Sequence, residues 1–262
     1  SFSAVGGYTS ITFGVRQVEA ESNDWEWYRV RAADDSFLAE TQYKLKLIAD
    51  GYGSSSRDVW DALRRDPNLA VVDASVVPSR GGFNDSEIPF RLEGLYYEDD
   101  TMAPIDIEVR DPLGGQVSQL TVIGVLDVVS DNFGNMGSGM FTARAMLEDA
   151  IPRVVPITRY RFKLSPGVDP SSAAKGLEAA FRDHGMETEV LAEVVNEQNS
   201  ANRAFNYLFT GYMAMGLLVG IASLGVISLR AVVERRQQIG VQRAIGYRRG
   251  MVQLSFLLES SF

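Results

Sequence analysis

The longest apolar stretch of the chain covers residues 207–229, with no charged side chain and three clearly polar ones, Thr210, Ser223 and Ser228. As an α-helix, rising about 1.5 Å per residue, it would extend about 35 Å, more than the hydrocarbon core of a bilayer at about 30 Å. The alternative is a buried helix of a large soluble protein, but such helices rarely run so far without a charge. The pattern therefore predicts a transmembrane helix over 207–229.

Before residue 207 the hydrophobic pattern alternates between strand and helix periods. Residues 159–164 and 43–47 show period-2 alternation, which predicts strands with one buried face and one wet face. Residues 69–77 and 120–129 are rich in β-branched side chains and are typical of more deeply buried strands. The sequence thus predicts an α+β fold, a mixed sheet with packed helices, over an outer domain of residues 1–195.

Two stretches carry helix start and stop signals. In the first, Ser56 is the candidate N-cap and Pro67 the stop, and the apolar face consists of Val59, Ala62 and Leu63. In the second, Asp169 is the candidate cap, Pro170 fits the first turn, and Gly185 ends the helix just after His184. Its apolar face consists of Ala173, Leu177 and Phe181.

The second helix lies within a predicted strand–helix–strand unit over residues 157–191. A polar segment follows and contains neither proline nor glycine before the apolar stretch. We therefore expect residues 196–206 to form a helical stalk that continues into the membrane span. No element is assigned to residues 1–40.

Charge is distributed very unevenly along the chain. Residues 230–262 contain six arginines and two glutamates, a balance of +4; the whole chain carries −9, so residues 1–229 carry −13. An acidic body lacks the basic face that nucleic acid requires, so no nucleic-acid partner is expected. Short arginine-rich segments stay on the cytoplasmic side of a membrane. We therefore predict that residues 230–250 are cytoplasmic and residues 1–206 extracytoplasmic.

The outer location implies further membrane segments. The N-terminal residues show neither the basic start nor the apolar run of a signal peptide, so we expect a membrane helix upstream of residue 1. Residues 251–262 begin another apolar stretch, which predicts the start of the next transmembrane helix and a multi-pass protein of the cell membrane. Within 207–229, Gly216 and Gly220 form a G-x-x-x-G pattern that favours close helix packing in lipid.

Signatures of enzymatic chemistry are sparse. The chain has no cysteine and one histidine, His184, to which we assign a structural role in a last helical turn. It contains no phosphate-binding G-x-x-x-x-G-K-[ST] loop, nucleophile elbow or H-E-x-x-H motif. We therefore predict no catalytic, cofactor-binding or metal-binding residues; the glycine- and aspartate-rich loops are interpreted as turns rather than calcium sites.

The run over residues 231–260 resembles the C-terminal signature of FtsX-like ABC transporter permeases, the superfamily that includes the MacB and LolCE types. It matches the family pattern in order and spacing at eleven positions, which are Glu234, Arg235, Ile239, Gly240, Arg243, Ala244, Ile245, Gly246, Arg248, Leu258 and Glu259. Gln238 stands where the family commonly has glutamate, and Tyr247 where it commonly has a small residue.

The resemblance implies that this segment is a coupling helix that docks on a separate ABC ATPase, which binds the ATP. The ATPase interface would then consist of Glu234, Arg235, Ile239, Gly240, Arg243, Ala244, Ile245, Gly246 and Arg248. The residues themselves agree, since Ile239, Val241 and Ile245 are candidate apolar anchors and Gly240 and Gly246 permit sharp turns. The alternative is that the arginines only fix topology and contact anionic lipid.

The resemblance also implies a non-catalytic permease subunit that couples ATP hydrolysis on its partner to movement of the outer domain. The outcome would be export or extraction of a lipid, lipoprotein, peptide or drug, or mechanical signalling. Expected partners are the ATPase, membrane lipids, and a second permease as homodimer, heterodimer or paired halves of one chain. Two alternatives stay open, a single-span sensor with a ligand-binding outer domain and a membrane-tethered hydrolase using paired carboxylates.

Overall fold

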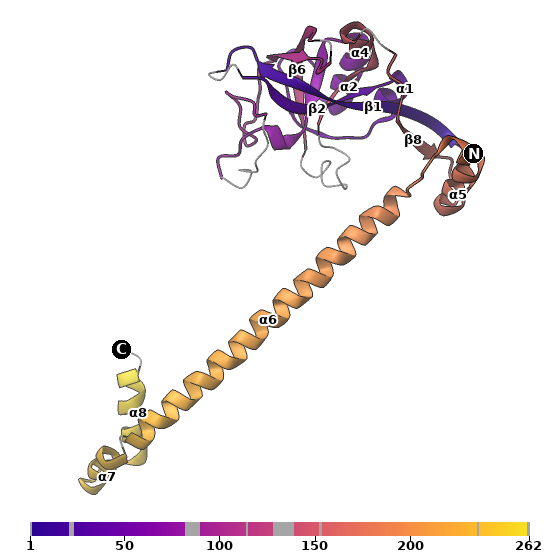
Figure 1. Ribbon diagram of the computed structural model, residues 1–262. Coiled ribbons are helices and arrows are strands. Elements are labelled where there is room, and N and C mark those ends of the chain that lie inside the picture. Colours follow the sequence, from indigo (N-terminus) through magenta and orange to yellow (C-terminus); the bar gives the residue numbers. More distant parts are fainter. Residues whose placement is uncertain are drawn as a thin grey trace. The chain divides into compact units, whose positions relative to one another are not determined.

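The computed structural model describes residues 2–20, 24–81, 90–113, 115–127, 139–151, 154–234 and 236–260 (Figure 1). The chain divides into two compact units, Ser1–Val195 and Asn196–Phe262. The strands are β1 (Phe2–Gln17), β2 (Glu26–Ala33), β3 (Leu45–Ile48), β4 (Leu69–Val72), β5 (Ile105–Arg110), β6 (Val117–Leu126), β7 (Met140–Ala143) and β8 (Arg159–Leu164). The helices are α1 (Asp35–Glu40), α2 (Ser56–Arg65), η1 (Ala74–Val76), α4 (Arg144–Ala150), α5 (Pro170–Ala180), η2 (Arg182–His184), α6 (Leu191–Glu234), α7 (Arg236–Ala244) and α8 (Arg249–Ser260).

Six strands of the N-terminal unit form a closed barrel. Starting from β1, the pairings run through β2, β7, β4, β6 and β5 and return to β1. The β2–β7 and β4–β6 pairs are parallel and the other four are antiparallel. Strands alternate their side chains between two faces, so one set fills the barrel. These buried residues include Phe13, Val15, Tyr28, Val30, Ile107, Val109, Leu120 and Val122.

One side of the outer wall of the barrel is covered by α1 and α2. Trp60 of α2 is only 1% exposed and meets the ring of Phe141 edge-on at 5.8 Å between centroids. The Trp60 indole N–H donates to the carbonyl oxygen of Tyr43 at 3.0 Å. Arg31 is buried beside the same cluster, with its guanidinium 5.4 Å from the Phe141 ring, and this burial lowers its pKa. The cluster joins the helices to the barrel.

The first half of β1 extends past the barrel and pairs with β8 in an antiparallel ribbon, seen as the long indigo strand in Figure 1. The segment after η2 is tied to α5, because Thr188 donates through its backbone N–H and its hydroxyl to Glu178 Oε1, both at 3.0 Å. The first turn of α6 is tied to α5 as well, because Ser171 Oγ donates to Glu193 Oε1 at 2.6 Å. The ribbon and α5 therefore hold the start of α6.

The strand predictions are confirmed in most cases. The expected strand at 159–164 has the bounds of β8, and those at 43–47 and 120–129 correspond to β3 and β6, although residues 128 and 129 lie outside the described residues. The prediction for 69–77 is wrong after Val72, where η1 replaces the strand. Asp73 causes this change, because its Oδ1 accepts from the Ser75 backbone N–H at 2.8 Å and turns the chain.

The predicted cap of the first helix is one residue too late. The N-cap is Ser55, which forms a capping box with Asp58, whereas Ser56 Oγ accepts from the Leu45 backbone N–H at 3.0 Å. The helix ends at Arg65, before the predicted stop at Pro67. Its buried apolar face includes Trp60, which the sequence analysis did not assign.

The predicted start of the second helix is confirmed, but α5 ends at Ala180 and the predicted end at Gly185 belongs to η2. Asp169 Oδ2 accepts from the Ser172 backbone N–H at 2.8 Å, and Gly185 adopts a left-handed φ of 69° after His184. Its apolar face is less buried than expected, because Phe181 is exposed and interrupts the helix between α5 and η2. The second strand of the predicted unit over 157–191 is wrong, since residues 186–190 belong to no strand and Thr188 binds α5 instead.

As expected, one helix of 44 residues, α6, runs through residues 196–206 and the apolar stretch; that residues 196–206 act as a stalk stays a prediction. Within the described part of the chain, one helical stretch, Arg203–Ile227, is long and apolar enough to cross a membrane, and its most apolar window is fully exposed. The helix continues past residue 229 to Glu234. Polar side chains of the apolar stretch form hydrogen bonds within the helix, and Ser223 Oγ donates to the Val219 carbonyl oxygen at 2.8 Å.

Candidate functional site

The candidate site is the segment that follows the apolar stretch and includes the end of α6, α7 and the start of α8. At the end of α6, Arg230 Nε lies 2.8 Å from Glu234 Oε1, an exposed ion pair one helical turn apart. Glu234, predicted as an interface residue, therefore has a partner within its own helix. Arg235, also predicted for the interface, lies outside the described residues. The helix α7 begins directly after it.

The α7 helix ends in a Schellman motif built around Gly246, which has a left-handed φ of 102°. The Tyr247 backbone N–H donates to the Gln242 carbonyl oxygen at 3.1 Å, and the Gly246 N–H donates to the Arg243 carbonyl oxygen at 3.2 Å. This pairing satisfies two carbonyl groups that a helix end otherwise leaves open. The predicted turn at Gly246 is confirmed.

The turn predicted at Gly240 is wrong, because Gly240 lies in the middle of α7. A Cβ atom added there would meet no atom within 4 Å, so no close approach explains the glycine. Glycine in a helix interior is less favourable than alanine by about 0.5–1 kcal/mol. The backbone conformation therefore requires glycine at position 246 but not at position 240.

This difference gives a matched prediction. We expect Gly246→Ala to destabilise the end of α7 by about 1–2 kcal/mol, because alanine tolerates the left-handed region poorly. Hydrogen exchange of the Tyr247 amide should then accelerate about tenfold. Gly240→Ala is expected to leave that exchange rate unchanged or slow it, and equal acceleration in both variants would contradict the assignment.

The helix α8 packs against α7 and buries part of its surface. Val252 of α8 is only 6% exposed, and Ile239 and Gln242, three residues apart on α7, are half-buried. Gln242 Oε1 is buried and accepts no hydrogen bond from the described residues. Ile239, predicted as an anchor for a partner, is thus partly used by the α7–α8 contact.

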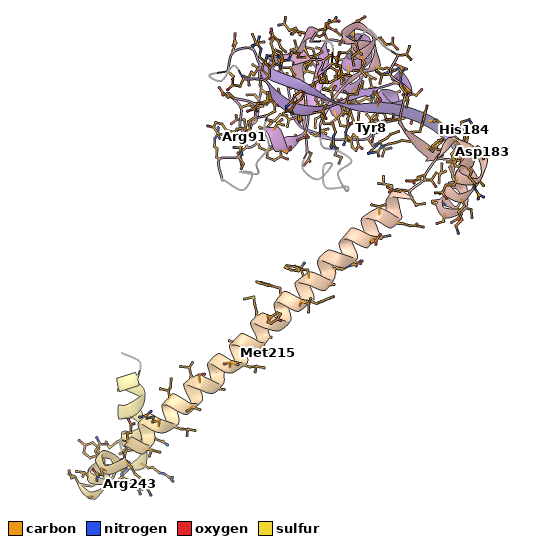
Figure 2. All side chains as sticks on the ribbon, in the orientation of Figure 1. Tyr8, Arg91, Asp183, His184, Met215 and Arg243 are labelled. Carbon is orange, nitrogen blue, oxygen red and sulfur yellow. The ribbon has the colours of Figure 1, made fainter. Side chains whose placement is uncertain are left out.

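Two faces of α7 remain exposed. Val241 and Ile245, one turn apart, are 58% and 73% exposed, so they form an apolar pair. Arg236 and Arg243, seven residues apart, lie on another face with Gly240 between them, and Arg243 is labelled in Figure 2. Neither arginine forms an ion pair within the described residues.

The other predicted residues lie nearby. Ala244 is exposed at the end of α7, and exposed Arg248 precedes α8, where its carbonyl oxygen accepts from the Met251 N–H at 2.9 Å. Gly216 and Gly220 lie one turn apart on α6, and an added Cβ at either would meet nothing within 4 Å. Their role in helix packing stays a prediction.

Two carboxylate pairs of the outer domain lie close together in the ranges that the structure describes: Asp35 and Asp61 share Arg64, and Glu26, whose pKa burial raises, has Asp24 nearby. The fully buried carboxylates are Asp73 and Asp111, and each binds its own turn. Asp73 accepts from the Tyr28 hydroxyl at 2.9 Å, and Asp111 Oδ1 from the Leu113 backbone N–H at 3.4 Å. No group of three or more acidic or histidine side chains in these ranges could hold a metal ion.

Comparison with known proteins finds relatives for both parts of the chain. Residues 211–262 match the family model for the FtsX-like permease C-terminal region. The macrolide export ATP-binding/permease protein MacB of Neisseria meningitidis is 28% identical over 182 residues, which cover 62% of this chain and 28% of that protein. MacB of Hyphomonas neptunium is 34% identical over 113 residues, which cover 38% of this chain and 17% of that protein.

Two solved structures are similar at lower levels. The periplasmic region of MacB from Actinobacillus actinomycetemcomitans gives a TM-score of 0.39 at 16% identity, covering 76% of each chain. The extracellular domain of the ABC-type transporter YknZ from Gram-positive bacteria gives 0.36 at 12% identity, covering 71% of this chain and 78% of that one.

Residues 211–262 therefore resemble the C-terminal region of FtsX-like permeases. More narrowly, the chain is similar to part of the MacB-type permeases, and its described residues contain one candidate membrane span. The chain spans 28% of the length of the Neisseria relative.

Proposed function

We propose that this chain couples ATP hydrolysis on a separate ABC ATPase to movement of its extracytoplasmic domain. The result would be export or extraction of a lipid, lipoprotein, peptide or drug, or mechanical signalling. The observation that carries the proposal is the exposure of α7, which presents an apolar pair on one face and, on another, two arginines without an ion pair among the described residues. This surface directly follows a helix that begins in the outer domain.

The surface of α7 fits a protein groove better than a lipid headgroup layer. Arginine alone would suffice for anionic lipid, whereas Val241 and Ile245 gain stability only when an apolar surface covers them. Arginine is one of the residue types enriched at the energetic centre of a protein interface. Arg243 and Arg248 could each pair bidentately with a carboxylate of the ATPase.

Transmission follows from the difference between two nucleotide states of the ATPase. A ligand shifts a conformational equilibrium only by its differential affinity for the two conformations. The α7 segment, docked differently in the two states, would displace α6. The helix α6 begins at Leu191, within the outer unit. Its displacement would therefore reach α5, which is hydrogen-bonded to the start of α6 through Ser171 and to the segment before it through Thr188.

We propose a separate ATPase subunit on the ground of the resemblance to FtsX-like permeases alone. The names of the MacB relatives join ATP-binding and permease in one protein, so an ATPase elsewhere in the same polypeptide is the alternative arrangement. In either arrangement residues 230–250 are proposed to be cytoplasmic, within a multi-pass protein that pairs with a second permease.

The docking proposal is tested by co-purifying the full-length protein with candidate ABC ATPases. We expect Ile245→Asp and Arg243→Glu each to weaken the association at least tenfold, because one places a charge in an apolar groove and the other reverses a charge pair. Arg182→Glu in the outer domain is the matched control and should bind normally. If both α7 variants bind as well as the control, the docking surface is wrong.

A further inference from the structure

The outer wall of the barrel is open where β1, β5 and β6 lie side by side. Trp27, Gly14, Arg110 and Val117 are consecutive neighbours across β2, β1, β5 and β6, so their Cα–Cβ directions share one face. The opposite face carries the buried barrel interior, including Phe13. Trp27 is 56% exposed and Val117 is also exposed, whereas Gly14 between them is buried beneath another side chain of this wall.

A second tryptophan lies on the same wall, held between two arginines. The guanidinium carbon of Arg16 is 4.6 Å from the ring centroid of Trp25, and that of Arg110 is 4.4 Å from it. Gly14 makes room for this ring, since an added Cβ would lie 3.4 Å from Trp25 Cε3. Arg16 is fixed in turn by Glu108, whose Oε2 accepts from its Nε at 2.7 Å. The ring and both guanidiniums are thus preorganised.

The surface is both aromatic and cationic. Arg29 lies two residues along β2 from Trp27, paired in register with Thr12, and is exposed. Neither Arg29 nor Arg110 forms an ion pair within the described residues, whereas Glu108 is already engaged by Arg16. We call this surface the Trp–Arg face and define it as Arg16, Trp25, Trp27, Arg29, Arg110 and Val117.

We propose that the Trp–Arg face binds an acidic segment of a partner protein outside the membrane. Residues 1–229 carry a net charge of −13, so most of this surface repels an acidic partner. The cationic Trp–Arg face is a place where such a partner is attracted instead. At physiological salt the Debye length is about 8 Å, so the nearby arginines outweigh the distant carboxylates. Two guanidiniums without carboxylate partners complement two carboxylates of such a segment.

The composition of the face favours a protein over a glycan or a lipid. Tryptophan and arginine are the residue types most enriched where protein interfaces concentrate their binding energy. Exposed apolar side chains border the face, namely Val18 after β1 and Leu113 in the β5–β6 turn. A partner must therefore supply apolar contacts beside its carboxylates, which an acidic peptide with leucines does and an anionic polysaccharide does not.

The test uses the full chain in detergent and two fluorescently labelled dodecapeptides, one of alternating Glu and Leu and one of alternating Lys and Leu. We expect binding of the Glu–Leu peptide alone, weakened about tenfold by Trp27→Ala and more by 0.5 M salt. Arg110→Glu should abolish that binding and create affinity for the Lys–Leu peptide. Trp27 is exposed and Arg110 is half-buried, and unchanged thermal unfolding of the variants would show that they fold.

Two controls keep the result specific. Arg182→Glu reverses an exposed arginine elsewhere in the same unit and should leave peptide binding unchanged. Polygalacturonate, an anionic glycan without apolar groups, is offered as a competitor and should not displace the peptide. Binding of polygalacturonate in place of the peptide, equal binding of both peptides, or no binding of either would each overturn the proposal.

Discussion

Replacing Ala204 by proline is expected to abolish ATP-driven movement of the outer domain while leaving the ATPase able to bind. Ala204 lies in the interior of α6, between its start in the outer unit and its apolar stretch. Proline there removes one backbone hydrogen bond and clashes with the preceding turn, at a cost of about 3 kcal/mol or more. The α7 surface is 32 or more residues further along the chain, from Arg236 onward, and is not altered.

The measurement exploits the absence of cysteine from the chain. Cysteines introduced at Thr101 and Met213 would carry spin labels, and their distance distribution would be compared between nucleotide states in the complex with the ATPase. We expect the state-dependent change in the parent protein and in Ala204→Leu, and its loss in Ala204→Pro. A change that persists in the proline variant, with ATPase binding intact, would show that α6 does not transmit the motion.

Replacing Trp60 by alanine is expected to destabilise the barrel by about 3–5 kcal/mol. The indole is almost completely buried, contacts Phe141 and donates its N–H to the Tyr43 carbonyl oxygen. The substitution leaves a cavity between α2 and the barrel and deprives that carbonyl oxygen of its donor. This is a large fraction of the stability of a typical domain.

The control for this experiment is the exposed tryptophan of the same domain. Trp27→Ala removes a side chain of the same type from an open wall, and its expected effect on unfolding is within about 0.5 kcal/mol. Unfolding in urea is monitored by hydrogen exchange at the amides of β4 and β6. These amides report the unfolding of the barrel and not that of the membrane helix. Comparable destabilisation by the two alanine variants would mean that Trp60 is not the packing centre described above.

Elements with strong local signals could be predicted from the sequence. In β8, basic side chains alternate with aromatic and aliphatic ones, and the N-cap of α5 is an aspartate followed by proline. Neighbouring residues alone therefore specify this strand and the start of this helix. The apolar stretch of α6 is equally local, because length and absence of charge decide it. The Schellman turn at Gly246 follows the same logic, since a glycine just after a helical pattern favours a left-handed cap.

The strand β1 illustrates what local patterns miss. Its alternation is interrupted by glycines whose purpose is visible only in three dimensions. A Cβ on Gly6 would lie 2.5 Å from Phe37 Cα, and Gly14 leaves room for Trp25. The sequence shows these glycines as strand breakers, whereas the fold uses them for close approach of other segments.

The coupling segment shows the same division. The arginines and the glycine-containing signature were recognisable, and so was the pair Val241 and Ile245 as candidate anchors. The partial burial of Ile239 and Gln242 was not, because it depends on how α8 returns against α7. A single helical period cannot indicate which of several apolar faces a later helix will cover.

Sequence alone determined the membrane-length apolar helix, the acidic body, the basic segment after the span and the family signature, because each depends on composition or on spacing within a few turns. Tertiary structure alone decided that six strands close into a barrel, that Trp27 on one wall of this barrel stays exposed, and that α7 exposes two faces. The physical reason is that hydrogen-bond partners of strands and the burial of helix faces are set by residues distant in the chain, where no local period carries the information.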